Sequence, residues 1–175
     1  MIKLSVFVIL TAFSSLSFSM HIAEGFLPIG WAAVWYVVSI PFVFFGIRKV
    51  SNFIKSDDRN IFRMAFIIGF VFVLSALKIP SVTGSCSHPT GIGLGAVVFG
   101  PFVMTVIGLV VLLFQALLIA HGGITTLGAN IFSMAIVGSF VGYFVFKILK
   151  RVKLNTNTSI FLTTFLSDLS TYAVT

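Results

Sequence analysis

Long apolar segments constrain the fold of this chain more than any other feature of its sequence. Four are long enough, or nearly so, to cross a bilayer, which needs about 20 apolar residues, and a fifth is still apolar at the last residue. The five segments are 27–47, 61–79, 101–120, 127–146 and 159–175. A lipid core offers no water to the backbone, so each segment must form a helix, and the continuous apolar runs do not fit the alternating pattern of barrel strands. The sequence predicts an all-α integral membrane protein with several crossings.

The composition agrees with a chain that lies in lipid. Hydrophobic residues make up 58% of the 175 residues and charged residues 9%, whereas soluble domains have roughly 25% charged residues. The net charge of +7 does not indicate nucleic-acid binding, because the cations lie in two loops and form no basic face. The single cysteine excludes an intrachain disulfide and a multi-cysteine zinc site.

Nine of the eleven cations lie in two clusters, which indicate the topology. The first cluster is Arg48, Lys49, Lys55, Arg59 and Arg63, and the second is Lys147, Lys150, Arg151 and Lys153. The positive-inside rule places both in the cytoplasm, but with an outer amino terminus, four ordinary crossings would put the second cluster outside. The conflict disappears if 91–100, with four glycines in ten residues, is a short crossing or half-helix that lines a buried cavity. All three histidines then face outside; the alternative is that the charge bias fails here.

The two ends of the chain have their own patterns. Residues 1–19 resemble a cleaved secretory signal peptide, because Lys3 precedes an apolar core of about ten residues, and Ser17 and Ser19 occupy the −3 and −1 positions. The mature chain would then be 20–175, a transmembrane metal-binding domain. An uncleaved signal anchor is the alternative. The last segment ends inside an apolar run without a helix stop signal, which predicts a C-terminally short chain.

A processed amino terminus would offer several nitrogen ligands to a metal. The α-amine of Met20, the amide nitrogen of His21 and the His21 imidazole can close two fused chelate rings in one plane. His88, followed by the rigid Pro89, is the natural fourth nitrogen because the topology places it on the same side. Square-planar nitrogen coordination favours Ni(II) or Cu(II) over tetrahedral zinc. The alternative is an interfacial histidine that bonds to water.

Four further polar residues are candidates for supporting or gating roles. Glu24 is expected to pin the terminal segment, since a carboxylate ligand would favour harder, octahedral ions. His121, beside two glycines, is an outer partner of the site, a gate or a helix cap. Asn130 either orients the terminal segment or faces a neighbouring helix. Gln115 has the same two interpretations.

An enzyme is the first rival class. A hydrolase could use Ser87 or Cys86 with a histidine, but the nucleophile elbow, the His-Glu-x-x-His motif and an orienting carboxylate are all missing from the sequence. Cys86 is more typical of a small packed residue than of a ligand, and Asp168 is expected to face the bundle interior without a recognisable partner. The sequence has no phosphate-binding loop, so any energy for transport must come from another protein.

Three stretches resemble the CbiM/NikM family, the substrate-binding membrane components of energy-coupling-factor transporters for cobalt and nickel. They are MHIAEGFLP at 20–28, SCSHPTGIGLG at 85–95, and 115–130, which includes HGGITTLGAN. The resemblance implies a bundle of about seven helices, of which this chain lacks roughly the last one and a half. It also implies that the Met20 amine, the amide and imidazole of His21, and His88 bind the metal.

The resemblance further implies a transport role with several partners. The substrate would be Co(II), for cobalamin biosynthesis, or Ni(II), without an organic cofactor. The partners would be a transmembrane T component, ATPase subunits and a small accessory membrane subunit. The location would be a bacterial or archaeal cell membrane, with the mature amino terminus and the metal entry on the outer side. A component of the same transporter class for an organic micronutrient, such as a vitamin, is the alternative.

Overall fold

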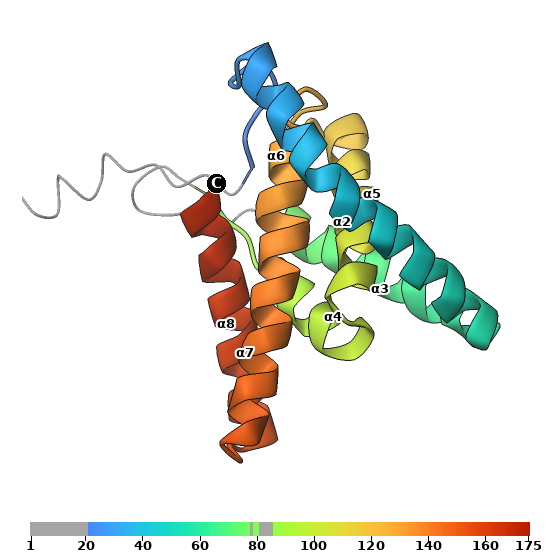
Figure 1. The fold of residues 1–175 in the computed structure, drawn as a ribbon. Helices are drawn as coiled ribbons and strands as arrows, with labels where there is room; N and C mark the ends of the chain where they lie inside the picture. The colour runs from blue at the N-terminus through green and yellow to red at the C-terminus, as the bar shows by residue number, and fades with distance from the viewer. Residues whose placement is uncertain (1–20, 78, 81–85) are drawn as a thin grey trace, which may run out of the picture.

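The computed structural model describes residues 21–77, 79–80 and 86–175, and these form a helical bundle (Figure 1). The helices are α2 (Ile29–Ser56), α3 (Arg59–Ala76), α4 (Ile92–Phe99), α5 (Pro101–Leu118), α6 (Leu127–Asn130), the π-helical η1 (Ile131–Gly138), α7 (Ser139–Arg151) and α8 (Thr156–Val174). Two short strands, β1 (Ile79–Pro80) and β2 (Cys86–Ser87), pair antiparallel. The predicted all-α membrane fold is confirmed. The proposed signal peptide and Met20 lie outside the described residues.

Among the residues that the structure describes, four helices are long and apolar enough to cross a membrane, as predicted. They are α2, α3, α5 and the continuous helix 127–151, which comprises α6, η1 and α7. Their ends differ from the predicted ones: α2 continues to Ser56, and α3 ends at Ala76 because Leu77 is extended and Ile79 pairs with Ser87. The fifth predicted segment is helical as α8, but it is not among the helices apolar enough to qualify as spans.

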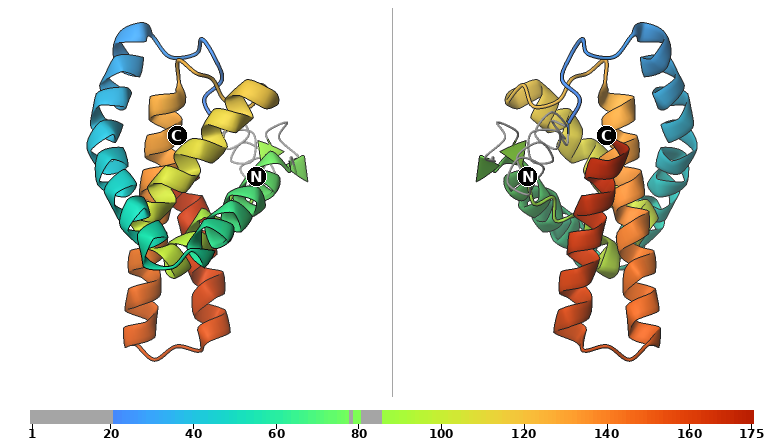
Figure 2. Two further views of the ribbon diagram at one scale, coloured as in Figure 1. Left: turned by 90° about the vertical axis from the view of Figure 1, so that its right-hand side faces the viewer. Right: turned by 90° about the vertical axis from the view of Figure 1, so that its left-hand side faces the viewer.

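The segment 91–100 forms a half-helix. The eight residues of α4 extend only about 12 Å at 1.5 Å per residue, too short for a hydrocarbon core of about 30 Å. Gly100 ends α4 with φ +81°, and Pro101 begins α5 directly after it. Figure 2 shows α4 low in the bundle and α5 returning towards the upper end. The glycines and the charge distribution thus correctly predict a short broken element here.

Small residues let α4 pack deep among the longer helices. A Cβ added at Gly93 would lie 2.6 Å from the Ser167 Cβ, and one at Gly142 would lie 2.9 Å from the Gly93 Cα. A Cβ added at Gly108 of α5 would lie 2.5 Å from the Cβ of Ala135. Such close approaches are typical of helix contacts in membranes, where small residues allow tight packing. They bury α4 between α7 and α8.

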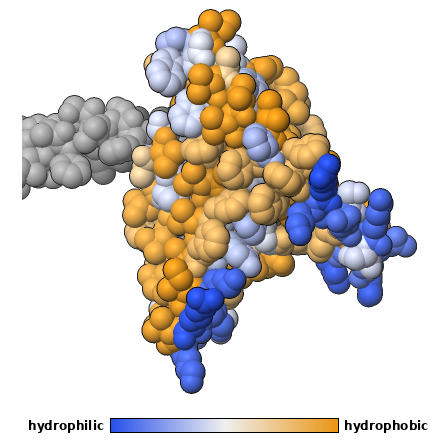
Figure 3. All heavy atoms as spheres, viewed as in Figure 1, coloured by the Kyte–Doolittle hydropathy of each residue, from blue (hydrophilic) through white to orange (hydrophobic). Residues whose placement is uncertain are grey.

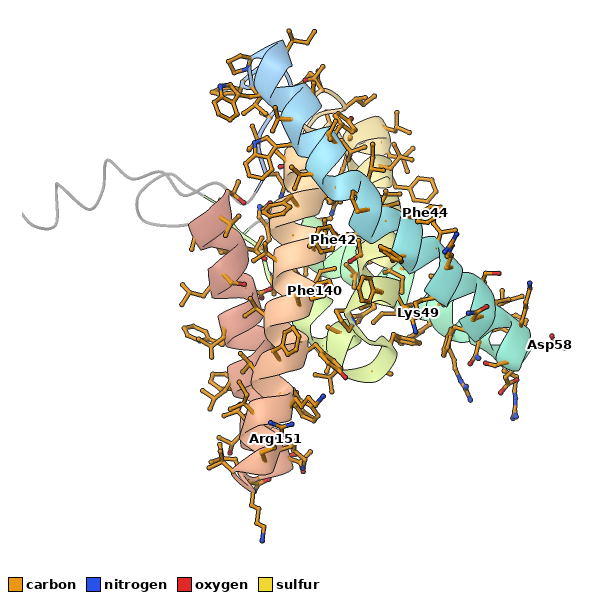
Figure 4. The ribbon with its side chains drawn as sticks, viewed as in Figure 1. Phe42, Phe44, Lys49, Asp58, Phe140 and Arg151 are labelled. Atoms are coloured by element: carbon orange, nitrogen blue, oxygen red, sulfur yellow. The ribbon has the colours of Figure 1, made fainter. Side chains whose placement is uncertain are left out.

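Helix α8 faces the bundle with a row of small hydroxyl residues. Its members are four residues apart along α8 and all are buried, which places the row on one side of the helix. The row comprises Ser159, Thr163, Ser167 and Thr171. The Ser167 hydroxyl donates a 2.7 Å hydrogen bond to the Gly138 carbonyl. On the opposite side of the bundle, α2 and α7 meet through the rings of Phe42 and Phe140, whose centroids are 5.8 Å apart (Figure 4).

The two cation clusters lie in the same half of the molecule. The first surrounds the turn between α2 and α3, and the second surrounds the turn between α7 and α8. In Figure 3 the hydrophilic areas lie at the bottom and at the right-hand edge, from mid-height downwards, beside a largely hydrophobic surface. Within the first cluster, Arg59 pairs with Asp57 at 3.2 Å. Both turns therefore lie towards the same end of the bundle.

Candidate metal-binding site

Three imidazole rings converge at the end of the bundle opposite the cation clusters. His21 precedes α2, His88 precedes α4, and His121 follows α5. The centroid of the His121 ring lies 4.4 Å from that of His21 and 4.8 Å from that of His88. The His21 and His88 centroids are 6.1 Å apart, and these two residues are only 6% and 5% exposed. The fold thus gathers three segments distant in sequence into one nitrogen-rich cluster, which we call the histidine cluster.

The His88 ring has a defined orientation. Its Nδ1 lies 2.8 Å from the carbonyl oxygen of Leu77. Because a carbonyl only accepts hydrogen bonds, Nδ1 donates its hydrogen and the ring lone pair lies on Nε2. Metal-binding histidines commonly donate their second ring nitrogen in this way, which fixes the tautomer and the ring. The contact therefore does not engage the lone pair of Nε2.

The segment that follows His21 is hydrogen-bonded to the start of the 127–151 helix. The Ile22 N–H donates to Oδ1 of Asn130 at 2.9 Å, and Nδ2 of Asn130 donates to the Ile22 carbonyl at 3.1 Å. The Thr126 hydroxyl donates to the same carbonyl at 2.7 Å. The backbone of Ile22 is thus held on both its N–H and its C=O side. Of the two interpretations of Asn130, the structure shows the side chain directed at the terminal segment.

The side chain of Glu24 attaches the terminal segment to the loop between α5 and α6 at a second point. The Thr125 N–H donates to the Glu24 carboxylate, at 3.1 Å from Oε2 and 3.3 Å from Oε1. Hydrogen bonding by Thr125 lowers the pKa of Glu24 below its ordinary value, so the carboxylate is ionised at neutral pH. Its position fits a pinning role better than metal ligation.

Gly123 lets the terminal segment lie flat on the loop between α5 and α6. A Cβ at this position would lie 2.6 Å from Cα of Glu24 and 2.7 Å from its backbone nitrogen. Since these are backbone atoms, no side-chain rotation could relieve the clash. The residue was part of a motif in the sequence, but its steric role becomes visible only in the structure.

The environment of His21 keeps its imidazole neutral. The pKa of His21 is lowered from 6.5 to about 3, mainly by burial and also by the neighbouring His121 and His88, while a hydrogen bond with Gln115 opposes the shift. A neutral imidazole is the form that binds a metal. Gln115 is itself fully buried, and its Nε2 donates to the Ser75 hydroxyl at 2.6 Å. Gln115 thus lies beside the cluster and also links α5 to α3.

The pKa of His21 predicts that the metal-free protein loses stability in acid. Between pH 6.5 and about 3, the unfolded chain binds a proton at His21 that the folded chain does not. Stability therefore falls as the pH falls through this window, by up to about 1.4 kcal/mol per pH unit for this one group. Thermal unfolding of metal-free protein in detergent between pH 7 and pH 5 measures the slope. His21→Asn should have a shallower slope; equal slopes would contradict the assigned pKa.

The described side chains do not form a complete metal site by themselves. Within 21–77, 79–80 and 86–175, no group of three or more His, Cys, Asp and Glu residues is arranged to hold a metal ion. Cys86 lies in β2, upstream of the histidine. The predicted amine ligand, Met20, lies outside the described residues.

Two residues of α8 contact the loop of His88, and the sequence did not predict either contact. The His88 N–H donates to the Tyr172 hydroxyl at 2.7 Å. The carboxylate of Asp168 accepts hydrogen bonds from the hydroxyl and the N–H of Thr90. Asp168, which was expected to face the bundle interior, therefore has a partner 78 residues away in sequence, a separation that leaves no local pattern.

The fold and the site together define a multi-pass membrane protein with a nitrogen-rich polar cluster enclosed at one end of the bundle. Comparison with known proteins identifies the family within this class. The chain belongs to the CbiM family: the family model for the cobalt uptake substrate-specific transmembrane region matches residues 21–175. This confirms the family predicted from the three motifs.

Relatives and solved structures agree with this assignment. The cobalt transport protein CbiM of Thermosipho melanesiensis is 62% identical over 92% of this chain and 68% of its own length. That of Desulforamulus reducens is 57% identical over 91% of this chain and 63% of its own length. The chain thus spans about two thirds of these relatives. A crystal structure of a truncated transition metal transporter has a TM-score of 0.79 and 30% identity, over 86% of this chain and 70% of the other.

Proposed function

We propose that this chain is the metal-binding transmembrane component of an energy-coupling-factor transporter that imports Co(II) or Ni(II). The observation that supports it most directly is the convergence of His21, His88 and His121 beside a pinned terminal segment. Nitrogen ligands suit cobalt and nickel. The relatives are named cobalt transport proteins, and similar structures are described as transition metal transporters, which favours cobalt as the first ion to test.

The proposed ligands are the Met20 amine, the amide and imidazole nitrogens of His21, and His88. Two features support this set: Asn130 holds the peptide next to His21, and Leu77 directs the lone pair of His88 onto Nε2. The set requires cleavage after Ser19, because otherwise the nitrogen of Met20 belongs to a peptide bond. His121, whose ring lies against both other rings, is proposed as an outer partner or gate of the bound ion.

The proposed transport direction follows from the positions of the charges. With the cation clusters in the cytoplasm, the histidine cluster would lie towards the outer side of a bacterial or archaeal cell membrane. The ion exchanges water for nitrogen ligands there, and it leaves inward when partner proteins move the bundle. Those partners would be a T component and ATPase subunits, with a small accessory membrane subunit. Imported cobalt would then support cobalamin biosynthesis.

A component for an organic micronutrient is the second candidate. Its site would need an enclosed, mainly apolar pocket with a few polar groups. The end of this bundle presents imidazoles, amides and hydroxyls instead. A hydrolase based on Ser87 or Cys86 has less support, since the relatives are named transport proteins.

Titration of Co(II) and Ni(II) into the purified mature protein tests the proposal. Loss of a direct ligand should cost more than the roughly 10–100-fold that loss of an outer partner costs, so His21→Ala and His88→Ala should weaken binding beyond that range. Asp58→Ala, at the other end of the bundle, should bind like the wild type. If both histidine variants keep full affinity, the proposed metal site is wrong.

A further inference from the structure

The last turns of α8 make two contacts with the short loop that contains His88. Tyr172 accepts a hydrogen bond from the His88 backbone N–H, and Asp168 accepts two from Thr90. Residues four apart lie on the same face of a helix, so both α8 side chains point at the same loop. The contacts connect residues 84 and 78 positions apart in sequence.

The loop depends on such external contacts for its position. His88 lies between β2 and α4, outside regular structure. Thr90 connects the two neighbouring elements, because its hydroxyl donates to Asp168 and accepts from the Ile92 N–H at 3.1 Å in the first turn of α4. A continuous set of hydrogen bonds thus runs from α8 through the loop to α4.

A carboxylate is a costly residue for holding a loop in a membrane protein. Charged groups at membrane depth are expensive and are kept mainly where they have a function. In the described part of the chain, the ion pairs are those of Asp57 with Arg59 and Arg63, so Asp168 is not balanced by a cation there. Its hydrogen bonds instead hold the residue two positions after His88.

We infer that Asp168 and Tyr172 are positioning residues for His88, and this inference rests on the proposed metal-binding function. The His88 ring is held at Nδ1 by Leu77 at the end of α3, and its backbone is held by Tyr172 of α8. Without the tyrosine hydroxyl, a buried N–H loses its acceptor, which favours a different loop conformation. The imidazole would then meet the metal at a poorer angle.

Tyr172→Phe and Asp168→Ala test the inference in the purified full chain. Each should weaken Co(II) and Ni(II) binding by about tenfold, as loss of an outer partner does, and should alter the d–d absorption of the bound ion. Asp168→Asn should restore most of the affinity, because its amide oxygen still accepts from Thr90. The matched controls are Tyr143→Phe on α7 and Ser170→Ala on α8, whose hydroxyl bonds within its own helix.

A double-mutant cycle separates positioning from general stability. If Tyr172 acts through His88, Tyr172→Phe should have no further effect on affinity in a His88→Ala background. Cu(II), which nitrogen ligands bind most tightly among these ions, keeps binding measurable there. Wild-type affinity and spectra in Tyr172→Phe and Asp168→Ala, or an undiminished effect without His88, would overturn the inference. Full affinity in His88→Ala itself would instead overturn the proposed function.

Discussion

Insertion of Gly-Ser between Ser19 and Met20 should abolish metal binding by the mature protein. Cleavage after Ser19 would then leave the α-amine two residues before Met20, and the nitrogen of Met20 would be part of a peptide bond. The fused chelate rings that share the His21 amide could not close as proposed. The imidazoles of His21 and His88 would remain, without the amine that completes the chelate. Isothermal titration with Ni(II) and Co(II), together with the intact mass of the purified chain, measures both the loss and the processing.

Two variants control for this result. Met20→Leu keeps the amine and changes only the side chain, so it should bind metal like the wild type. The same Gly-Ser insertion after Lys153, an exposed residue in the turn before α8, should also leave binding intact. Undiminished binding by the extended amino terminus would show that the α-amine is not a ligand.

Gly123→Ala should also remove metal binding while the bundle still folds. The added Cβ would lie 2.6–2.7 Å from backbone atoms of Glu24, so the terminal segment must lift away from the loop. Lifting breaks the bonds of Ile22 with Asn130 and Thr126. All ligands supplied by the terminus are displaced together, and the loss should exceed that of the single-ligand variant His88→Ala.

Gly30→Ala is the matched control, because a Cβ there has no atom within 4 Å. It should bind metal normally and should be slightly more stable, since alanine favours a helix more than glycine does. Metal titration and thermal unfolding of the two variants side by side separate binding from folding. Normal affinity in Gly123→Ala would mean that the terminal segment does not need this close contact.

The larger features of the fold were predictable because they depend on composition over many residues. Apolar length identified the spans, and the charge clusters required an additional short element, observed as α4 (Ile92–Phe99). The end of α3 was not predictable, because Ile79 continues the apolar run but pairs with Ser87 as a strand. The π-helical turn pattern of η1 (Ile131–Gly138) likewise depends on packing and not on local sequence preference.

For the candidate site, the sequence indicated which residues could bind a metal, but it did not indicate which residues hold them in position. His21 could be proposed because a new amino terminus ending in Met20-His21 can chelate a metal, and His88 because the predicted topology places its loop on the same side. The contacts of Tyr172 and Asp168 could not, since each joins α8 to a loop about 80 residues away and no sequence period links them. Nor could the Leu77 carbonyl be predicted, because every residue has one.

Because His88 is hydrogen-bonded to residues at the ends of two different helices, movement of these helices would change its position. Its ring is tied to the last turn of α3 and its backbone to the end of α8, whereas the terminal segment is tied to Asn130 on a third helix. Spreading α3 from α8 would therefore rotate one of the proposed ligands, His88, and leave the others in place. An ion held by four donors would be loosened stepwise, beginning at the imidazole of the loop, without unfolding of the amino-terminal chelate.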